Sequence, residues 1–186
     1  AGRGIIHAEG PTKDFVKKGG TIEGIQLWLN LPAEKKMISA NYQHAKNDHF
    51  NVVSSEDGKV NTQIIAGELD GNYGRIKTQT QVNAFMISVE NGGEQTISFP
   101  KSHQGMLYLL KGDVVVNDSE TLALNENQLI QFNQDGEGFS IKGKGKSTLL
   151  FLSGVPFNEK VTSYGPYVMN TQTEIMEAMR DYQMGK

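Results

Sequence analysis

The chain has 186 residues, of which 37% are hydrophobic and 21% charged, with a formal net charge of −3 and no cysteine. This length allows one domain or two small ones, the charge gives no electrostatic case for direct contact with nucleic acid, and the missing thiols exclude disulfides, thiolate metal ligands and cysteine nucleophiles. Because no apolar run approaches membrane-spanning length and the N-terminus lacks a signal-like pattern, we expect a cytoplasmic protein without membrane contact.

Residues 1–9 are predicted to form a β-strand that carries His7 and Glu9. Residues two apart on a strand point to the same face, so this imidazole and this carboxylate would project side by side. Together they are half of the ligands that a mononuclear non-haem metal site needs, which makes them candidate metal ligands. The alternative is that the His-x-Glu tripeptide is only the polar face of a strand.

The segment that follows contains two connectors and one strong strand pattern. Residues 10–20 predict a loop with a mobile basic tip. Over residues 25–31 aliphatic side chains alternate with polar or aromatic ones, which indicates a strand with one face for a core and Trp28 on a cavity wall or an interface. Residues 37–48 are polar and aperiodic, so we place a domain boundary in this connector.

From about residue 49 to 160, short apolar runs alternate with turn residues, which is typical of a β-sandwich or barrel. The Gly112-Asp113 pair suits a two-residue turn, so the strands on either side of it are predicted to form a hairpin. The predicted strands are His49–Ser54, Val60–Ala66, Ala84–Val89, Gln95–Phe99, Met106–Leu110, Asp113–Asn117, Gln128–Phe132, Gly138–Lys142 and Thr148–Ser153.

One segment, at the C-terminus, predicts a helix. Thr171 and Glu174 have the spacing of a capping box, and Gly185 is placed to end the helix. Four residues at helical spacing would form the face that docks against a domain: Ile175, Ala178, Met179 and Tyr182.

Four segments of the chain also occur in the order of a known family. Gly4-Ile-Ile-His7-Ala-Glu9 comes first, and Gly24-Ile-Gln-Leu-Trp-Leu-Asn-Leu-Pro32 follows. Near the C-terminus stand Gly154-Val-Pro-Phe-Asn-Glu159 and the quite specific Tyr164-Gly-Pro-Tyr-Val-Met-Asn-Thr171. In these segments the chain resembles the pirin family of the cupin superfamily over nearly its whole length. Ser39-Ala-Asn-Tyr42 departs from the family pattern because it lacks the expected prolines.

The resemblance implies an all-β protein of tandem cupin-type jelly rolls (double-stranded β-helices), with a metal in the first and a C-terminal α-helix. For this chain it implies a C-terminal remnant of the first cupin domain at 1–45, a second cupin domain without a metal site at 46–162, and a C-terminal segment with the helix at 163–186. Four protein ligands bind iron in that family: a His-x-His pair, then a His and a Glu. His7 and Glu9 match the last two, and this sequence holds no match for the pair, so we expect an incomplete and inactive form.

The same resemblance implies Fe(II) or another divalent metal in the full-length protein, and a quercetin 2,3-dioxygenase-like activity on a flavonol-like small molecule. The alternative is a non-enzymatic protein-interaction module, because pirin-like proteins also act as regulatory partners of transcription factors. Without the rest of a first domain, the aliphatic face of residues 25–31 would be exposed, so we expect a homo-oligomer or a complementing N-terminal fragment to cover it.

The second domain can be compared with the general cupin pattern of a His-x-His pair followed by a Glu and then a Gly. If Gly112 is taken as that Gly, the ligand positions fall on residues that bind metals weakly or not at all: Phe99 and Lys101, or Ser98 and Pro100, and then Gly105. We therefore expect no metal site there. His103 lies out of register and is predicted to lie on a surface loop, as are His44 and His49.

Overall fold

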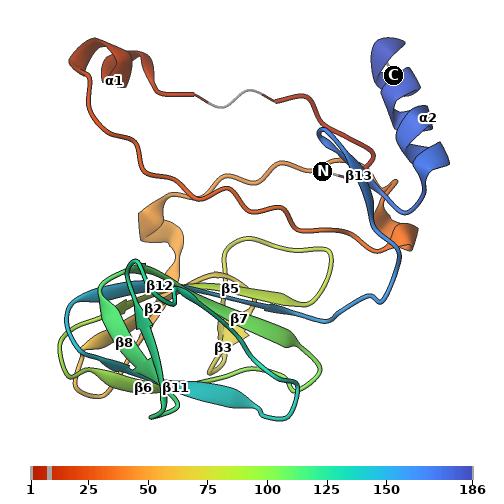
Figure 1. Ribbon diagram of the computed structural model, residues 1–186. Coiled ribbons are helices and arrows are strands. Elements are labelled where there is room, and N and C mark those ends of the chain that lie inside the picture. Colours follow the sequence, from red (N-terminus) through yellow and green to blue (C-terminus); the bar gives the residue numbers. More distant parts are fainter. Residues whose placement is uncertain (1, 8–9, 186) are drawn as a thin grey trace. The chain divides into compact units, whose positions relative to one another are not determined.

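The computed structural model describes residues 2–7 and 10–185 and divides into two compact units (Figure 1). One unit is Gln43–Pro156, and the other combines Ala1–Tyr42 with Phe157–Lys186. The predicted domain limits, 1–45, 46–162 and 163–186, stay predictions. Within the described residues, no helix is both long and apolar enough to cross a membrane.

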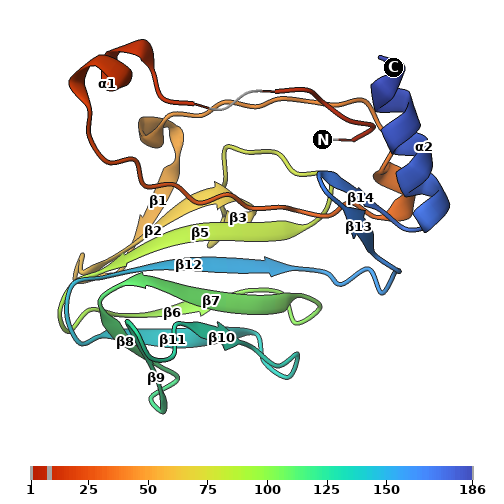
Figure 2. The same cartoon turned by 45° about the horizontal axis from the view of Figure 1, so that its top comes forward.

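The Gln43–Pro156 unit is built from two facing antiparallel sheets (Figure 2). The larger sheet has the order β1-β2-β5-β12-β7-β10 and the smaller has the order β6-β11-β8-β9. Their bounds are β1 Asn51–Ser54, β2 Val60–Ala66, β5 Val82–Val89, β6 Glu94–Ser98, β7 Gln104–Lys111, β8 Asp113–Val116, β9 Glu120–Ala123, β10 Leu129–Gln131, β11 Gly138–Gly143 and β12 Ser147–Gly154. A short pair, β3 (Glu68–Leu69) and β4 (Asn72–Tyr73), and the 3-10 turn η2 (Asn47–His49) complete the unit.

Alternation along the strands places the core between the two sheets. In β2 and β5 every second side chain is buried, so one face of the strand is removed from water while the other is at least partly exposed. The largest fully buried side chains of this unit are Phe85, Phe139, Phe151, Ile64, Ile87, Ile97, Leu107, Leu109, Leu122, Ile141 and Leu149. The predicted all-β, double-sheet fold with a C-terminal helix is confirmed, and each of the nine predicted strands is present.

The predicted hairpin at Gly112-Asp113 is wrong. β7 pairs with β12 and β10, whereas β8 pairs with β11 and β9. Gly112 therefore carries the chain from one sheet to the other, because the strand after it finds its partners in the facing layer. A turn signal in the sequence marks the change of direction but does not say which strand becomes the neighbour.

The N-terminal part of the other unit differs from the sequence predictions. Residues 4–7 are not a strand, and residues 21–32 have no strand partner despite their alternation. Alternating apolar residues form a strand only where another strand satisfies their backbone groups, and none of the described residues does so here. The predicted loop at 10–20 contains the short helix α1 (Lys13–Lys18), whose first turn is capped by the Thr12 hydroxyl accepting from the Phe15 N–H. The 3-10 turn η1 (Ala33–Lys35) follows.

The C-terminal part of that unit is a hairpin followed by a helix. β13 (Thr162–Tyr164) pairs with β14 (Tyr167–Met169), and α2 (Gln172–Gln183) packs beside both (Figure 2). The predicted capping box of Thr171 and Glu174 is confirmed. Ile175 is fully buried, but Tyr182 is 59% exposed, so the docking face is shorter than the sequence predicts.

Candidate functional site

The candidate metal ligands fall in the N-terminal part of the chain. His7 is exposed and lies in the irregular segment 4–7, and Glu9 lies outside the described residues. Because residues 4–7 are not a strand, the two-residue spacing of His7 and Glu9 no longer implies that their side chains point in the same direction. Within residues 2–7 and 10–185, no group of three or more histidine, aspartate or glutamate side chains is arranged to hold a metal ion. The assignment of His7 and Glu9 as ligands stays a prediction.

Two other histidines lie on the surface, as predicted. His44 and His49 are both exposed. The Nδ1 atom of His49 accepts from the Lys46 N–H at 3.4 Å, and its Nε2 atom lies 3.7 Å from an Asp48 carboxylate oxygen. These contacts close the short turn η2, so His49 has a local structural role.

His103, by contrast, is buried, and its prediction as a surface residue is wrong. It ends the turn before β7, where its N–H donates to the Pro100 carbonyl, and only 4% of its surface is exposed. Its Nδ1 atom lies 3.0 Å from the Ser153 hydroxyl on β12, and the same hydroxyl accepts from the Asn83 amide on β5 at 3.2 Å. Because a hydroxyl both donates and accepts, the ring tautomer decides whether Nδ1 donates to Ser153 or accepts from it. The Nε2 atom has no hydrogen-bond partner among the described residues.

A signal for this burial exists in the sequence. His103 has the same parity as three inward positions of the strand that it precedes: Gly105, Leu107 and Leu109. The inward alternation of β7 therefore begins one step before the strand itself. A histidine next to a loop is more often exposed, and that general tendency outweighed the local pattern.

Burial lowers the pKa of His103 below the usual value of a histidine, so we expect acid to destabilise the Gln43–Pro156 unit. The unfolded chain takes up this proton near pH 6.5 whereas the folded state resists it, so stability is fully present above about pH 6.5 and declines below it. His103→Gln should flatten this decline, measured as urea midpoints from about pH 7.5 to 5. His44→Gln removes an exposed histidine and should keep the wild-type slope; equal slopes in all three proteins would contradict the assignment.

Aromatic rings fill the interior of the same unit around Phe99 and Gly105, two positions that the cupin pattern assigns to ligands. Phe99 lies 5.1 Å from Phe151 between ring centroids, Phe139 lies 5.0 Å from Phe151, and Phe132 stacks on Phe139 at 4.7 Å. A Cβ atom at Gly105 would lie 3.0 Å from the Phe99 ring. The rings thus occupy the space that a side chain at position 105 would need, and the buried surface here is apolar.

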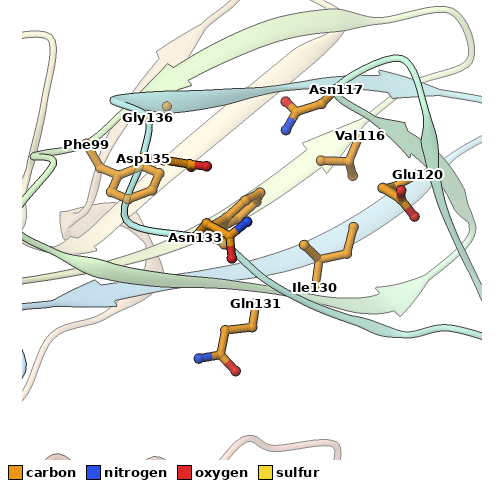
Figure 3. Close-up of a pocket in the computed structure, with 11 residues that line it drawn as sticks. Phe99, Val116, Asn117, Glu120, Ile130, Gln131, Asn133, Asp135 and Gly136 are labelled. Atoms are coloured by element: carbon orange, nitrogen blue, oxygen red, sulfur yellow. The ribbon is translucent and has the colours of Figure 1, made fainter.

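A cavity of about 450 Å³ opens beside these rings (Figure 3). It lies between the edge strand β10 of the larger sheet and strands β8, β9 and β11 of the smaller one. Its apolar wall consists of Val116, Ile130 and the two rings Phe99 and Phe132. Its other lining residues are Asn117, Glu120, Gln131, Asn133, Asp135, Gly136 and Gly138. No single stretch of the sequence indicates this cavity, because its walls come from residue 99, from residues 116–120 and from residues 130–138.

The motifs near the C-terminus have a structural role in the other unit. One Glu159 carboxylate oxygen accepts from the Ala33 N–H at 2.8 Å and from the Asn170 side-chain amide at 3.0 Å. Lys36 is 5% exposed, and its ammonium donates to the Asn30 amide oxygen at 2.6 Å. Burial lowers the pKa of Lys36, while Glu159 and Glu174 oppose that effect. These contacts fasten residues 30–36 to the segment that leads into α2.

A family model and two curated relatives all match this chain to pirin-like proteins. The pirin C-terminal cupin domain matches residues 84–186. A pirin-like protein of Solanum lycopersicum is 35% identical over 188 residues, which cover 100% of this chain and 62% of the relative. Pirin of Homo sapiens is 30% identical over 188 residues with the same coverage of both chains. The chain spans about three fifths of the length of these curated relatives.

A solved structure supports the fold. The crystal structure of a quercetin 2,3-dioxygenase from Acinetobacter baumannii matches with a TM-score of 0.79 and 32% sequence identity. The match covers 85% of this chain and 54% of that one. The similarity therefore extends beyond the residues that match the C-terminal cupin domain.

Proposed function

Because the chain belongs to the pirin family of the cupin superfamily, we propose that it is part of a metal-dependent, quercetin 2,3-dioxygenase-like protein in which His7 and Glu9 are two of four metal ligands. The observation that carries this proposal is the similarity to a quercetin 2,3-dioxygenase over 85% of the chain. The flavonol-like substrate class and the location in the cytoplasm belong to the proposal as well.

The donor types fit Fe(II), but their number does not. Imidazole and carboxylate ligands suit divalent iron, which when bound would supply open coordination positions to substrate or dioxygen. Two protein ligands rarely hold a divalent ion against water, since structural and catalytic sites use three or four. We therefore propose that the remaining ligands come from outside these 186 residues, and that the chain alone is inactive.

Titration with Mn²⁺ as a paramagnetic probe tests the ligand assignment without an activity assay. In the wild-type chain, Mn²⁺ should first broaden the amide signals of residues 4–7 and 10, with weak affinity because the ligand set is incomplete. His7→Ala should abolish this broadening, whereas His44→Ala should leave it unchanged. Broadening that begins elsewhere, or that survives His7→Ala, would falsify the assignment. Elemental analysis after dialysis, with intact mass, should find far less than one metal per chain.

A second candidate function is protein interaction, which one specific observation favours. Residues 25–29 hold a run of large apolar side chains in which Ile25 is 46% exposed, Leu27 49%, Trp28 64% and Leu29 53%. Several large apolar side chains exposed within one short segment are costly in water. We propose that it binds protein, and that in solutions of this chain alone a second copy covers it.

Light scattering after size exclusion tests this second candidate. We expect self-association that increases with concentration, together with a blue shift in the emission of Trp28, the single tryptophan of the chain. Leu27→Asp should abolish both effects, because a charge cannot be buried unpaired in an apolar interface. A monomer at every concentration, with unchanged emission, would count against a second copy as the occupant.

A further inference from the structure

The cavity beside the aromatic rings has the size and lining of a small-molecule site. Its volume of about 450 Å³ lies within the usual range of ligand pockets. Phe99 and Phe132 form a wall against which a flat or ring-shaped molecule can pack, and Ile130 extends that wall. A molecule placed there would remove apolar surface from water on one side and meet polar groups on the other.

The polar groups on the other side are fixed by the backbone around them. The Asn117 side-chain oxygen accepts from the Ser140 N–H at 2.9 Å, and the Asn117 N–H donates to the Ser140 carbonyl at 3.0 Å. These two bonds hold Asn117 in place and leave its side-chain NH₂ to donate to a ligand. Figure 3 shows the side chains of Asn117, Asn133 and Asp135 turned toward the same opening.

The charges in the cavity lining exclude anionic ligands. Glu120 and Asp135 line the cavity, and no lysine or arginine does. Within the described part of the chain, no hydrogen bond or ion pair occupies either carboxylate. Two carboxylates repel an anion, and as pure acceptors they require a ligand that donates hydrogen bonds. Hydroxyl groups meet this requirement, because they donate to the carboxylates and also accept from the Asn117 amide.

We propose that this cavity binds a neutral ring compound with neighbouring hydroxyl groups. The ring packs against Phe99 and Phe132, one hydroxyl donates to Asp135, and another donates to Glu120. A phenol with adjacent hydroxyls and a simple sugar share this chemistry. The proposal is independent of the metal assignment, since neither His7 nor Glu9 takes part in it.

Titration of the ¹⁵N-labelled chain with catechol and with D-glucose tests the proposal. For rings of this size we expect a dissociation constant on the order of 10 mM, with chemical-shift changes centred on Asn117, Asn133 and Gly136. Shifts with catechol alone would assign the site to phenols, and shifts with glucose alone to sugars. Benzoate has a ring of the same size but is anionic, and it should cause no such shifts.

Charge-neutral variants identify the groups that carry the binding. Asp135→Asn and Glu120→Gln keep the shape of each side chain while removing its charge, and each should weaken binding about tenfold. Glu126→Gln is the matched control, because Glu126 is exposed and lies outside the cavity lining. The proposal is overturned if neither probe shifts the lining residues, if benzoate binds as well as catechol, or if the two variants bind like the control.

Discussion

Replacing Phe151 with alanine is expected to lower the free energy of unfolding of the Gln43–Pro156 unit by about 3–5 kcal/mol. Phe151 is fully buried in β12, the strand between β5 and β7. Its ring lies 5.6 Å from Phe85, 5.1 Å from Phe99 and 5.0 Å from Phe139 between centroids. Removing the ring forfeits the free energy of burying it and leaves a cavity. The neighbouring rings cannot fill that cavity, because they are already packed from both sheets.

Urea unfolding followed by circular dichroism measures this loss. Leu129→Ala is the matched control, since Leu129 lies in the edge strand β10 and is 55% exposed. A substitution at such a position usually changes stability by less than about 0.5 kcal/mol. If Phe151→Ala cost no more than this control, the aromatic cluster would not be the packed centre of the fold.

Nine strands of this unit are predictable because each one carries its own signal, whereas β9 is not among the predicted strands. Val60–Ala66 alternates buried and half-buried residues and ends in turn residues, so its local pattern and its place in the sheet agree. The short pairs β3 with β4 and β13 with β14 are not predicted either, because strands of two or three residues carry little alternation of their own.

Residues 25–31 show where this reasoning fails. Their alternation is as strong as that of any strand in the chain, yet none of the described residues pairs with them. A segment forms a strand only when a neighbouring strand hydrogen-bonds with it, and a local sequence pattern does not show which segment that neighbour is. The same reason explains the wrong hairpin at Gly112, where the predicted turn is present but the predicted pairing is not.

For the candidate sites too, local sequence patterns are predictable, whereas contacts between distant segments are not. The assignment of His7 and Glu9 rests on a resemblance together with a local spacing, and it stays a prediction. The prediction of His103 as a surface residue follows the general tendency of histidines, and its contact with Ser153 on β12 is one that no local pattern contains. The cavity beside Phe99 likewise brings together residues 99–138, and no single segment of them carries the signal of a binding site.

Replacing Gly112 with alanine is expected to lower the free energy of unfolding by about 2–5 kcal/mol, from two additive effects. Gly112 has a φ of +84°, in the left-handed region where a side chain is strained. A Cβ atom there would also lie 2.4 Å from the Lys146 carbonyl oxygen and 2.7 Å from the Ser147 Cα atom. The backbone cannot yield easily, because the Ser147 hydroxyl accepts from the Asp113 N–H at 3.0 Å and donates to the Asp113 carbonyl at 2.9 Å.

Gly92→Ala separates the two effects, which makes this the sharpest test of how the chain passes between the sheets. Gly92 has a φ of +72°, but beyond its chain neighbours no atom lies within 4 Å of the added Cβ. It should therefore lose only the conformational part, about 1–2 kcal/mol, in the same urea experiment. Equal losses in the two variants would mean that the segment around Ser147 moves aside at no cost. A clearly larger loss at position 112 would show that the crossing between sheets is fixed by close packing, which explains why only glycine suits the point where β7 gives way to β8.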